Sequence, residues 1–253
     1  MTVFYFTATG NSLYVAKRLG GKLLSIPQVL KTSETAYSDD VIGIVCPCYA
    51  GGIPRIVNRF LNKATLKSEY IFTIMTYGNE QTSALDQMKK YGAAQGVRFN
   101  YMNSILMVNN YLPMFNVEEE IVKIPQKNIE NAINAVIKDV LSKKQYILPT
   151  SCANKFWGAV FRSGAKKMTG GNSDIRFTVN DVCTSCGICA KLCPVSNITV
   201  GNNVVYHHQC EGCLACIHHC PAGAIHIKGE KNGKRFCNGN IGLEEIIAAN
   251  DLH

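Results

Sequence analysis

The stretch FYFTATGNSLY, residues 4–14, decides how the first half of the chain folds. It begins with apolar and aromatic residues that are typical of a buried strand, and apolar residues from Leu13 to Leu19 then recur at helical spacing. Between the two patterns lie hydroxyl and amide side chains and one glycine, with no lysine or arginine. Gly20 and Gly21 end the helical pattern. The stretch therefore predicts a strand, a polar loop and a helix, which together form one βα unit.

Strands and helices continue to alternate downstream of this unit. Four further apolar runs are typical of strands: residues 23–26, 41–46, 70–76 and 99–108. Three amphipathic patterns are typical of helices: residues 56–61, 85–91 and 129–140. Strands that alternate with helices favour a parallel sheet covered on both faces. We therefore expect an α/β domain with a doubly wound parallel sheet over residues 1–145.

Composition places the chain among folded proteins rather than disordered or secreted ones. Hydrophobic residues make up 47% of its 253 residues, which is enough for a buried core. The first residues lack the features of a signal peptide, and the uncharged stretch 41–54 is too short to cross a bilayer. Twelve cysteines would suggest disulfides in a small secreted domain, but no export signal is present. We expect a soluble cytoplasmic protein without a membrane span, whose thiols are reduced or bind metal.

Residues 146–173 predict a connector between two domains. Its basic residues are Lys155, Arg162, Lys166 and Lys167, with no acidic residue between 151 and 173. We interpret these charges as a solvated face or a docking patch for an acidic partner, in preference to nucleic-acid binding. A short amphipathic helix carries an apolar stripe of Phe156, Trp157, Val160 and Phe161. We expect this stripe to pack across the domain junction; a contact with a partner or a membrane surface is the alternative.

Eight of the twelve cysteines form a repeated pattern. The runs CTSCGICAKLCP (183–194) and CEGCLACIHHCP (210–221) each read C-x2-C-x2-C-x3-C-P, and every cysteine of the first run has a counterpart 27 residues later. This doubled spacing is the bacterial signature of two [4Fe–4S] clusters. A zinc site usually takes two pairs of ligands and has no use for the third and fourth cysteines of each run. The pattern thus favours iron–sulfur clusters over zinc or disulfides.

Each predicted cluster takes three cysteines from one run and the proline-linked cysteine of the other. The first set is Cys183, Cys186, Cys189 and Cys220. The second set is Cys210, Cys213, Cys216 and Cys193. Gly187 and Gly212 leave room for the backbone to close around a cluster. We expect His218 and His219 to support the ligands or face solvent, because cysteines fill all eight positions. Residues 174–228 resemble bacterial-type ferredoxins, which implies a small α+β domain within residues 174–253.

A cluster that carries single electrons needs a source and a sink, and the loop TATGNS (residues 7–12) is placed to bind one of them. Doubly wound sheets bind ligands outside the carboxyl ends of their strands, and the helix that follows favours an anion there. The hydroxyls of Thr7, Thr9 and Ser12 and the amide of Asn11 can donate to a phosphate, while Gly10 permits the turn. The loop matches neither dinucleotide nor nucleoside-triphosphate fingerprints. Alone, it fits a simple helix cap equally well.

Two further loops follow neighbouring strands and strengthen the case for a ligand. The loop CPCYAGGIP follows 41–46 and the loop TYGNE follows 70–76. Their tyrosines offer aromatic faces, and their glycines let the backbone approach a flat ring. Three such loops at one sheet edge describe a site for flavin mononucleotide (FMN). The predicted site residues are Thr7, Thr9, Gly10, Asn11, Ser12, Pro47, Cys48, Tyr49, Ala50, Gly51, Gly52, Tyr77, Gly78 and Asn79. Cys46 and Cys48 predict small buried residues near the ring, with a redox dithiol as the alternative.

Residues 1–145 resemble flavodoxins, and the whole chain resembles a family of fused flavodoxin-like and two-cluster ferredoxin proteins of anaerobic microbes. The resemblance rests on residues 9–12, which read Thr-Gly-Asn-Ser, and on residues 49–55, which fit Tyr-x-Gly-Gly-x-Pro-Arg. Ala8 stands where relatives frequently have glycine. The resemblance implies a strand order of 2-1-3-4-5 and the cofactors FMN and two [4Fe–4S] clusters. Asn110 and Tyr111, at the end of the next strand, are weaker candidates for contacts with the flavin edge.

The two cofactor types together predict electron transfer. A flavin takes two electrons and releases them singly, whereas each cluster passes one electron at a time. We expect a carrier that relays electrons between redox partner proteins, with one cluster near the flavin and the other near the surface. The alternative is a reductase whose flavin reduces a small molecule by hydride transfer and is reloaded through the clusters. No nicotinamide fingerprint is present.

Overall fold

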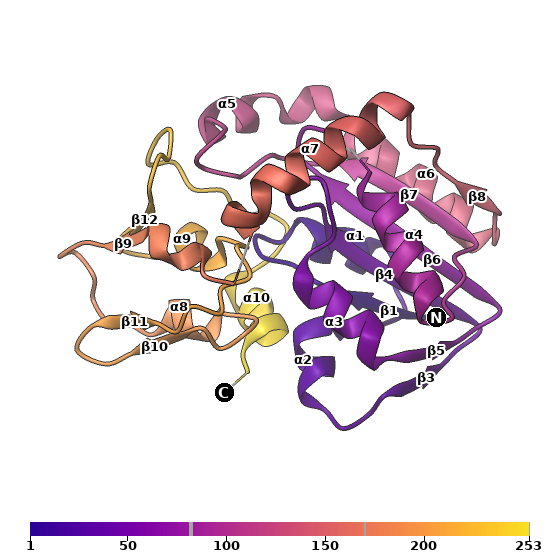
Figure 1. The fold of residues 1–253 in the computed structure, drawn as a ribbon, viewed down its shortest axis with the longest axis horizontal. Coiled ribbons are helices and arrows are strands. Elements are labelled where there is room, and N and C mark those ends of the chain that lie inside the picture. The colour runs from indigo at the N-terminus through magenta and orange to yellow at the C-terminus, as the bar shows by residue number, and fades with distance from the viewer. Residues whose placement is uncertain (81–82, 170, 253) are drawn as a thin grey trace.

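A six-stranded parallel sheet forms the centre of the larger lobe (Figure 1). The computed structural model describes residues 1–80, 83–169 and 171–252. The strands lie in the order β2-β1-β4-β6-β7-β8, and all neighbours are parallel. Their bounds are β1 Thr2–Tyr5, β2 Lys22–Ser25, β4 Val41–Pro47, β6 Tyr70–Tyr77, β7 Tyr101–Leu106 and β8 Tyr146–Ile147. A separate parallel pair joins β3 (Ala36–Ser38) to β5 (Thr65–Lys67). Counted along the chain within the main sheet, the first five strands follow the order 2-1-3-4-5, and β8 extends the edge.

Helices cover both faces of this sheet. Alternate residues of the first strand divide between two cores, with Val3 and Tyr5 in one core and Phe4 and Phe6 in the other. The first core includes α1 (Asn11–Leu19) and α6 (Ile129–Leu141), and the second includes α2 (Ile26–Lys31), α3 (Arg55–Lys63) and α4 (Ala84–Ala94). The predicted α/β architecture with a doubly wound parallel sheet is confirmed.

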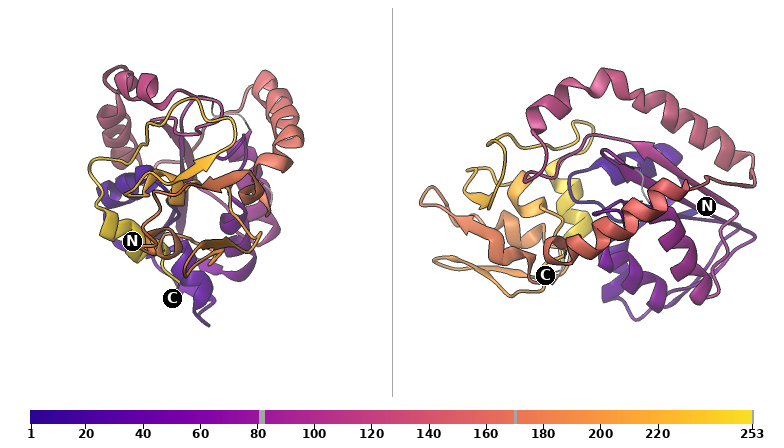
Figure 2. Two further views of the ribbon diagram at one scale, coloured as in Figure 1. Left: turned by 90° about the vertical axis from the view of Figure 1, so that its left-hand side faces the viewer. Right: turned by 45° about the horizontal axis from the view of Figure 1, so that its top comes forward.

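Two helical segments outside this core lie at the top of the molecule in the view of Figure 1. The chain between β7 and α6 forms α5 (Val117–Val122) and the short helix η1 (Ile124–Lys127). After β8, α7 (Cys152–Thr169) runs from the sheet toward the second lobe, as Figure 1 and the right view of Figure 2 show. With 18 residues, α7 is longer than the short helix that the sequence predicts.

The prediction that the apolar stripe of α7 packs across a domain junction is wrong for Phe156 and Trp157, the first two residues of the stripe. Phe156 is 64% exposed and Trp157 is 55% exposed, because α7 lies on the outside of the molecule. Val160 reaches the wall of a cavity, although it remains 47% exposed. The side chains of Phe161 and of the basic residues Arg162, Lys166 and Lys167 lie outside the described part of the structure.

The smaller lobe, residues 173–227, repeats itself in space as it does in sequence; we call it the cysteine lobe. After η2 (Ser173–Arg176), its elements are β9 (Phe177–Val179), α8 (Ile188–Lys191), β10 (Ile198–Val200), β11 (Val204–Tyr206), α9 (Ala215–His218) and β12 (Ile225–Ile227). The elements β11, α9 and β12 repeat β9, α8 and β10 with an offset of 27 residues. Each repeat pairs its first strand, antiparallel, with the last strand of the other repeat. The 27-residue duplication therefore includes the strands as well as the cysteines.

The C-terminal tail, residues 228–252, returns to the sheet lobe (Figure 1). Its helix α10 (Leu243–Asn250) buries Ile246 and Ala249 in the same core as α1. The hydroxyl of Ser25 donates to the Ala249 carbonyl, and Lys17 pairs with Glu245 at 2.5 Å. The tail thus contributes to the packing of the first 145 residues, although its sequence follows the cysteine lobe.

Candidate functional site

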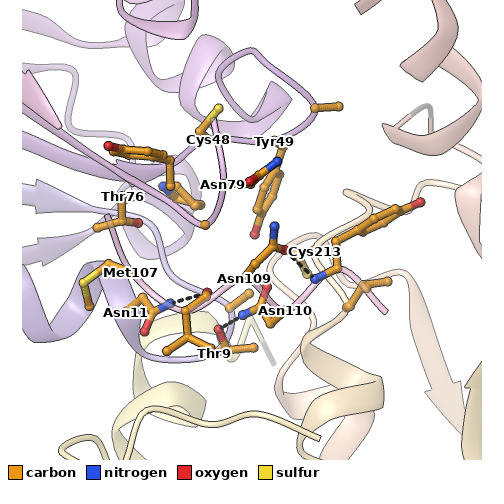
Figure 3. Close-up of a pocket in the computed structure, with 18 of the residues that line it drawn as sticks. Thr9, Asn11, Cys48, Tyr49, Thr76, Asn79, Met107, Asn109, Asn110 and Cys213 are labelled. Atoms are coloured by element: carbon orange, nitrogen blue, oxygen red, sulfur yellow. Dashed lines mark hydrogen bonds between the residues drawn. The ribbon is translucent and has the colours of Figure 1, made fainter. Parts of the chain in front are cut away.

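A cavity of about 520 Å³ lies at the carboxyl ends of β1, β4, β6 and β7, where the sheet lobe meets the cysteine lobe (Figure 3). Its volume is typical of a site for a ligand of cofactor size. Gly10 and Gly52, although predicted, do not line it. The other twelve predicted site residues do: Thr7, Thr9, Asn11, Ser12, Pro47, Cys48, Tyr49, Ala50, Gly51, Tyr77, Gly78 and Asn79. The structure thus brings the three predicted loops together around one space.

The loop of residues 7–12, which we call the phosphate loop, has the features of an anion site. No side chain caps the N-terminus of α1, and Gly10 precedes the helix with a φ of 96°. The Thr7 hydroxyl accepts a hydrogen bond from the Gly10 N–H at 3.2 Å, and the Thr9 hydroxyl accepts one from the Asn110 amide at 2.6 Å. A hydroxyl that accepts one bond still has its own proton to donate. Uncapped helix N–H groups and these two hydroxyls fit a phosphate without a basic residue.

The structure gives two other residues of the phosphate loop a different use from the predicted one. The Asn11 amide donates to the Val108 carbonyl at 3.3 Å (Figure 3). It also accepts a hydrogen bond from the Asn238 amide at 3.1 Å. The Ser12 hydroxyl shares a hydrogen bond of 2.8 Å with the Thr76 hydroxyl. Both side chains therefore tie the loop to its neighbours, which leaves the donation to an anion mainly to backbone N–H groups and to Thr7 and Thr9.

The second loop closes as a tight turn. Tyr49 and Gly52 exchange both backbone hydrogen bonds, at 2.9 and 3.0 Å. Ala50 and Gly51 between them adopt left-handed backbone angles, with φ of 47° and 78°. This pairing explains why Gly52 closes the turn instead of lining the cavity. Cys46 is buried in the core below the loop, and Cys48 is half-buried and lines the cavity.

The third loop, residues 76–80, is anchored by the buried ion pair between Lys127 and Glu120. Gly78 packs so closely on Asn109 that a Cβ would lie 2.5 Å from the Asn109 Cα. The Gly78 carbonyl accepts a hydrogen bond from the Lys127 ammonium at 3.2 Å, and Lys127 pairs with Glu120 at 3.1 Å. Burial opposes ionisation of Glu120, but hydrogen bonds from Lys123 and Lys127 outweigh it and lower its pKa.

The structure adds lining residues that the site prediction omits. They come from the sheet edge and loop after β7, from α7 and from the cysteine lobe: Ala8, Thr76, Glu80, Met107, Val108, Asn109, Asn110, Tyr111, Met114, Phe115, Val160, Gly212, Cys213 and Leu214. Asn110 and Tyr111 were the weaker candidates named from the sequence, because they follow the last long strand. Ala8, Thr76 and Glu80 belong to two of the predicted loops, whereas tertiary packing brings the remaining residues to the cavity.

In each predicted cluster set, the other three thiols lie near enough to one member to raise its pKa. Burial raises the pKa of Cys189 to about 11, and three thiols raise it further: Cys186, Cys220 and Cys183. Burial raises the pKa of Cys216 well above its ordinary value, and the thiols that act on it most are Cys213, Cys210 and Cys193. These groups match the two predicted sets. Cys189 also acts on Cys216, so the two sets are neighbours.

The backbone around the cysteines donates to sulfur and turns in the same way in both runs. Asn197, Gly212 and Ala224 N–H groups donate to the sulfurs of Cys193, Cys210 and Cys220 at 3.1, 3.3 and 3.3 Å. Left-handed backbone angles recur 27 residues apart at Ser185 and Gly212, Gly187 and Leu214, and Ser196 and Gly223. Thiols in fours, with N–H groups aimed at their sulfurs, are a donor set that fits two iron–sulfur clusters.

Two features are absent from the part of the chain that the structure describes. No group of three or more His, Cys, Asp or Glu side chains there is arranged to hold a metal ion. A cubane makes a different demand from a single ion, because each thiolate binds a separate iron. In the same described ranges, no helix combines the length and apolar character needed to cross a membrane.

His218 links the second cysteine run to the sheet lobe instead of facing solvent. Its Nε2 donates to the Asn110 carbonyl at 2.9 Å, and its Nδ1 accepts from the Phe236 N–H at 3.2 Å. Burial lowers the pKa of His218 to about 3, which keeps the ring neutral with one donor and one acceptor. The ring therefore connects a cavity loop, the cysteine lobe and the tail.

No known protein-family model matches the chain. Over 68 residues it is 35% identical to Protein NrdI of Bartonella quintana; the match covers 25% of this chain and 49% of NrdI, so the chain spans about half of that relative. A protein of Bacteroides uniformis described as a flavoprotein aligns with a TM-score of 0.34 and 17% identity, covering 47% of this chain and 94% of that one. Two-electron reduced flavodoxin of Megasphaera elsdenii aligns with a TM-score of 0.30 and 17% identity, covering 41% and 83%.

Proposed function

We propose that this protein transfers electrons between two [4Fe–4S] clusters and FMN, and so couples one-electron steps to two-electron steps. The observation that carries the proposal is the position of Cys213. This member of the second cysteine set lines the same cavity as the phosphate loop and Tyr49. The proposed flavin and cluster sites would therefore share a wall, and this proximity supports electron transfer between the two cofactors.

The exposure of the cysteines indicates which cluster set would exchange electrons with a partner protein. In the first set, Cys186 is exposed and Cys183 is half-buried. In the second set, Cys193, Cys210 and Cys216 are buried, and Cys213 lies at the cavity. A redox partner protein would therefore exchange electrons at the first set, and the second set would connect the first to the flavin.

The chain's own residues would hold the flavin in the cavity. The phosphate loop would bind the phosphate, and Tyr49, Tyr77 and Gly78 would surround the ring. FMN, when bound, supplies the chemistry that accepts two electrons and releases them one at a time. The backbone N–H groups that donate to the cysteine sulfurs would stabilise the more negative, reduced form of each cluster.

Cofactor analysis tests this proposal directly. The protein is purified without oxygen, and its flavin, iron and acid-labile sulfide are measured. We expect about one FMN and about eight irons per chain. Zinc in place of iron, or intact clusters without any flavin, would contradict the proposal.

A second candidate function is reduction of a small molecule at the flavin. The cavity extends past the three predicted loops to Met114, Phe115 and Val160. Glu80 is the one charged side chain in its described lining, which favours a neutral, apolar substrate over an anionic one. A reduced protein that neutral quinones reoxidise with saturation, and anionic quinones do not, would favour the enzyme over the carrier.

A further inference from the structure

Three consecutive carbonyls of the phosphate loop accept hydrogen bonds from the C-terminal half of the chain. The Thr7 carbonyl accepts from the Asn250 amide at 3.1 Å, and the Ala8 carbonyl accepts from the His219 Nε2 at 3.0 Å. The Thr9 carbonyl accepts from the Asn238 backbone N–H at 2.8 Å. These donors come from α10, from the end of the second cysteine run and from the tail. We infer that they form a clamp that positions the phosphate loop, so that the FMN site is complete only with the C-terminal half in place.

The clamp fixes the directions of the N–H groups as well as the carbonyls. A trans peptide is planar, so its N–H points away from its own carbonyl. Carbonyls bound to the C-terminal half therefore turn the N–H groups of Ala8, Thr9 and Gly10 to the opposite side. Gly10 uses its N–H for the Thr7 hydroxyl, and the described residues offer no partner to the other two. Successive N–H groups held on one side form a concave anion site.

The tail rests directly on the loop. A Cβ at Gly10 would lie 2.9 Å from the Asn238 Cβ and 3.1 Å from the Ile241 Cβ. The Asn238 amide also donates to the Asn11 amide oxygen at 3.1 Å. Gly10 is therefore required twice, for its left-handed backbone and for the close approach of the tail.

The clamp also explains a departure from the cysteine repeat. His219 stands where the first run has Leu192, which is fully buried. The duplication alone does not require a histidine there. The Nδ1 of His219 lies 3.3 Å from the Cys237 sulfur, and with the thiol donating to Nδ1, the proton on Nε2 is free to donate to Ala8. The second run thus carries a residue suited to the loop of the other lobe.

This inference rests on the proposed FMN site, and linkage makes it reciprocal. If docking of the C-terminal half strengthens phosphate binding, then FMN must stabilise that docking by the same factor. Riboflavin, which lacks the phosphate, should not take part in this coupling. A variant that weakens the affinity for FMN but not for riboflavin therefore disturbs the clamp and not the fold in general.

The test titrates the full-length, flavin-free protein with FMN and with riboflavin, following quenching of flavin fluorescence. Asn250→Leu removes one side-chain donor while keeping the same branched shape, and His219→Leu removes another. We expect each variant to weaken FMN binding by roughly three- to tenfold and to leave riboflavin binding within about twofold of wild type. His219→Gln, whose amide can donate as Nε2 does, should restore most of the FMN affinity.

Gln28→Leu is the matched control, because the Gln28 amide donates to the tail carbonyls of Ala248 and Asp251 without contacting the loop. It should change neither affinity. Equal weakening of FMN and riboflavin, or no weakening of either, overturns the clamp. A wild-type protein that binds neither flavin overturns the proposed function, and the clamp with it.

Iron content is also measured for the His219 variants, because His219 is next to Cys220. If these variants lose iron, the FMN and riboflavin affinities of Asn250→Leu alone decide whether the clamp exists. If Asn250→Leu does not fold, Asn238→Ala, which removes the bond to Asn11, takes its place under the same criteria.

Discussion

Tyr49 and Cys213 come from different lobes and line the same wall of the cavity (Figure 3). The Tyr49 hydroxyl is buried and has no hydrogen-bond partner among the described residues. Burial raises the pKa of Tyr49 well above its ordinary value, and the neighbouring Cys213 thiol raises it further. An unpaired buried hydroxyl costs about 1 to 3 kcal/mol. Sulfur atoms of a cluster at Cys213 would give this hydroxyl an acceptor, so we expect it to donate to the cluster.

Tyr49→Phe should therefore lower the reduction potential of the cluster that Cys213 ligates. A donor to cluster sulfur stabilises the reduced, more negative state, and losing it should lower the potential by roughly 20 to 60 mV. Spectroelectrochemical titration of the purified protein measures the change. Tyr77→Phe is the control. Tyr77 also lines the cavity, but burial and the Glu80 carboxylate raise its pKa, with no contribution from Cys213. Potentials that move equally in both variants would contradict the assignment.

Cys213→Ala and Cys186→Ala should each remove one cluster and leave FMN bound. Each substitution deletes a ligand of a different predicted set, so iron should fall by about four per chain in each variant. Two of the three clamp donors, Asn238 and Asn250, lie outside the second cysteine run, which is why FMN should remain. Iron, sulfide and flavin analysis measures the outcome. Loss of both clusters together with the flavin from either variant would show that the sites do not assemble separately.

The sequence predicts the three cavity loops because parallel strands bring their carboxyl ends to one edge. It predicts the grouping of the cysteines because their spacing is a local feature of each run. The tail is different, because nothing in the sequence around Asn238 or Asn250 indicates that these residues reach a loop more than 220 positions earlier. The side of α7 that faces the cavity could not be predicted either, since an apolar stripe fits packing across a domain junction as well as a contact with a partner or a membrane surface. Tertiary packing decides such contacts.

Gly43→Ala should destabilise the sheet lobe without affecting the cysteines. A Cβ at Gly43 would lie 2.2 Å from the Cζ of Phe72, whose ring is fully buried on the neighbouring strand. Such overpacking typically costs about 1 to 3 kcal/mol in the free energy of unfolding. Gly201→Ala is the control, because a Cβ there meets no atom within 4 Å. Chemical denaturation compares the two, and equal stability would show that the Phe72 ring moves aside freely.

Glu120→Gln should destabilise the protein in a way that depends on pH. Its carboxylate pairs with Lys123 and with Lys127, whose side chain is only 8% exposed, so the substitution leaves a buried ammonium without its anion. We expect a loss of about 1 to 3 kcal/mol in the free energy of unfolding at neutral pH. Because the pKa of Glu120 in the folded protein lies below its ordinary value of 4.5, the unfolded chain takes up the proton first as the pH falls.

The stabilisation from Glu120 is therefore complete above that ordinary value and is lost as the pH falls through the lower folded pKa. The difference between wild type and Glu120→Gln should shrink over this acidic range, as measured by urea denaturation at a series of pH values. Glu118→Gln on the same helix is the control, because Glu118 is exposed and should give a small difference at every pH. A Glu120→Gln deficit that stays constant down to acid pH would show that the ion pair contributes through packing and not through charge. Since Lys127 also donates to Gly78, the same variant should weaken FMN binding if the pair holds the third loop in place.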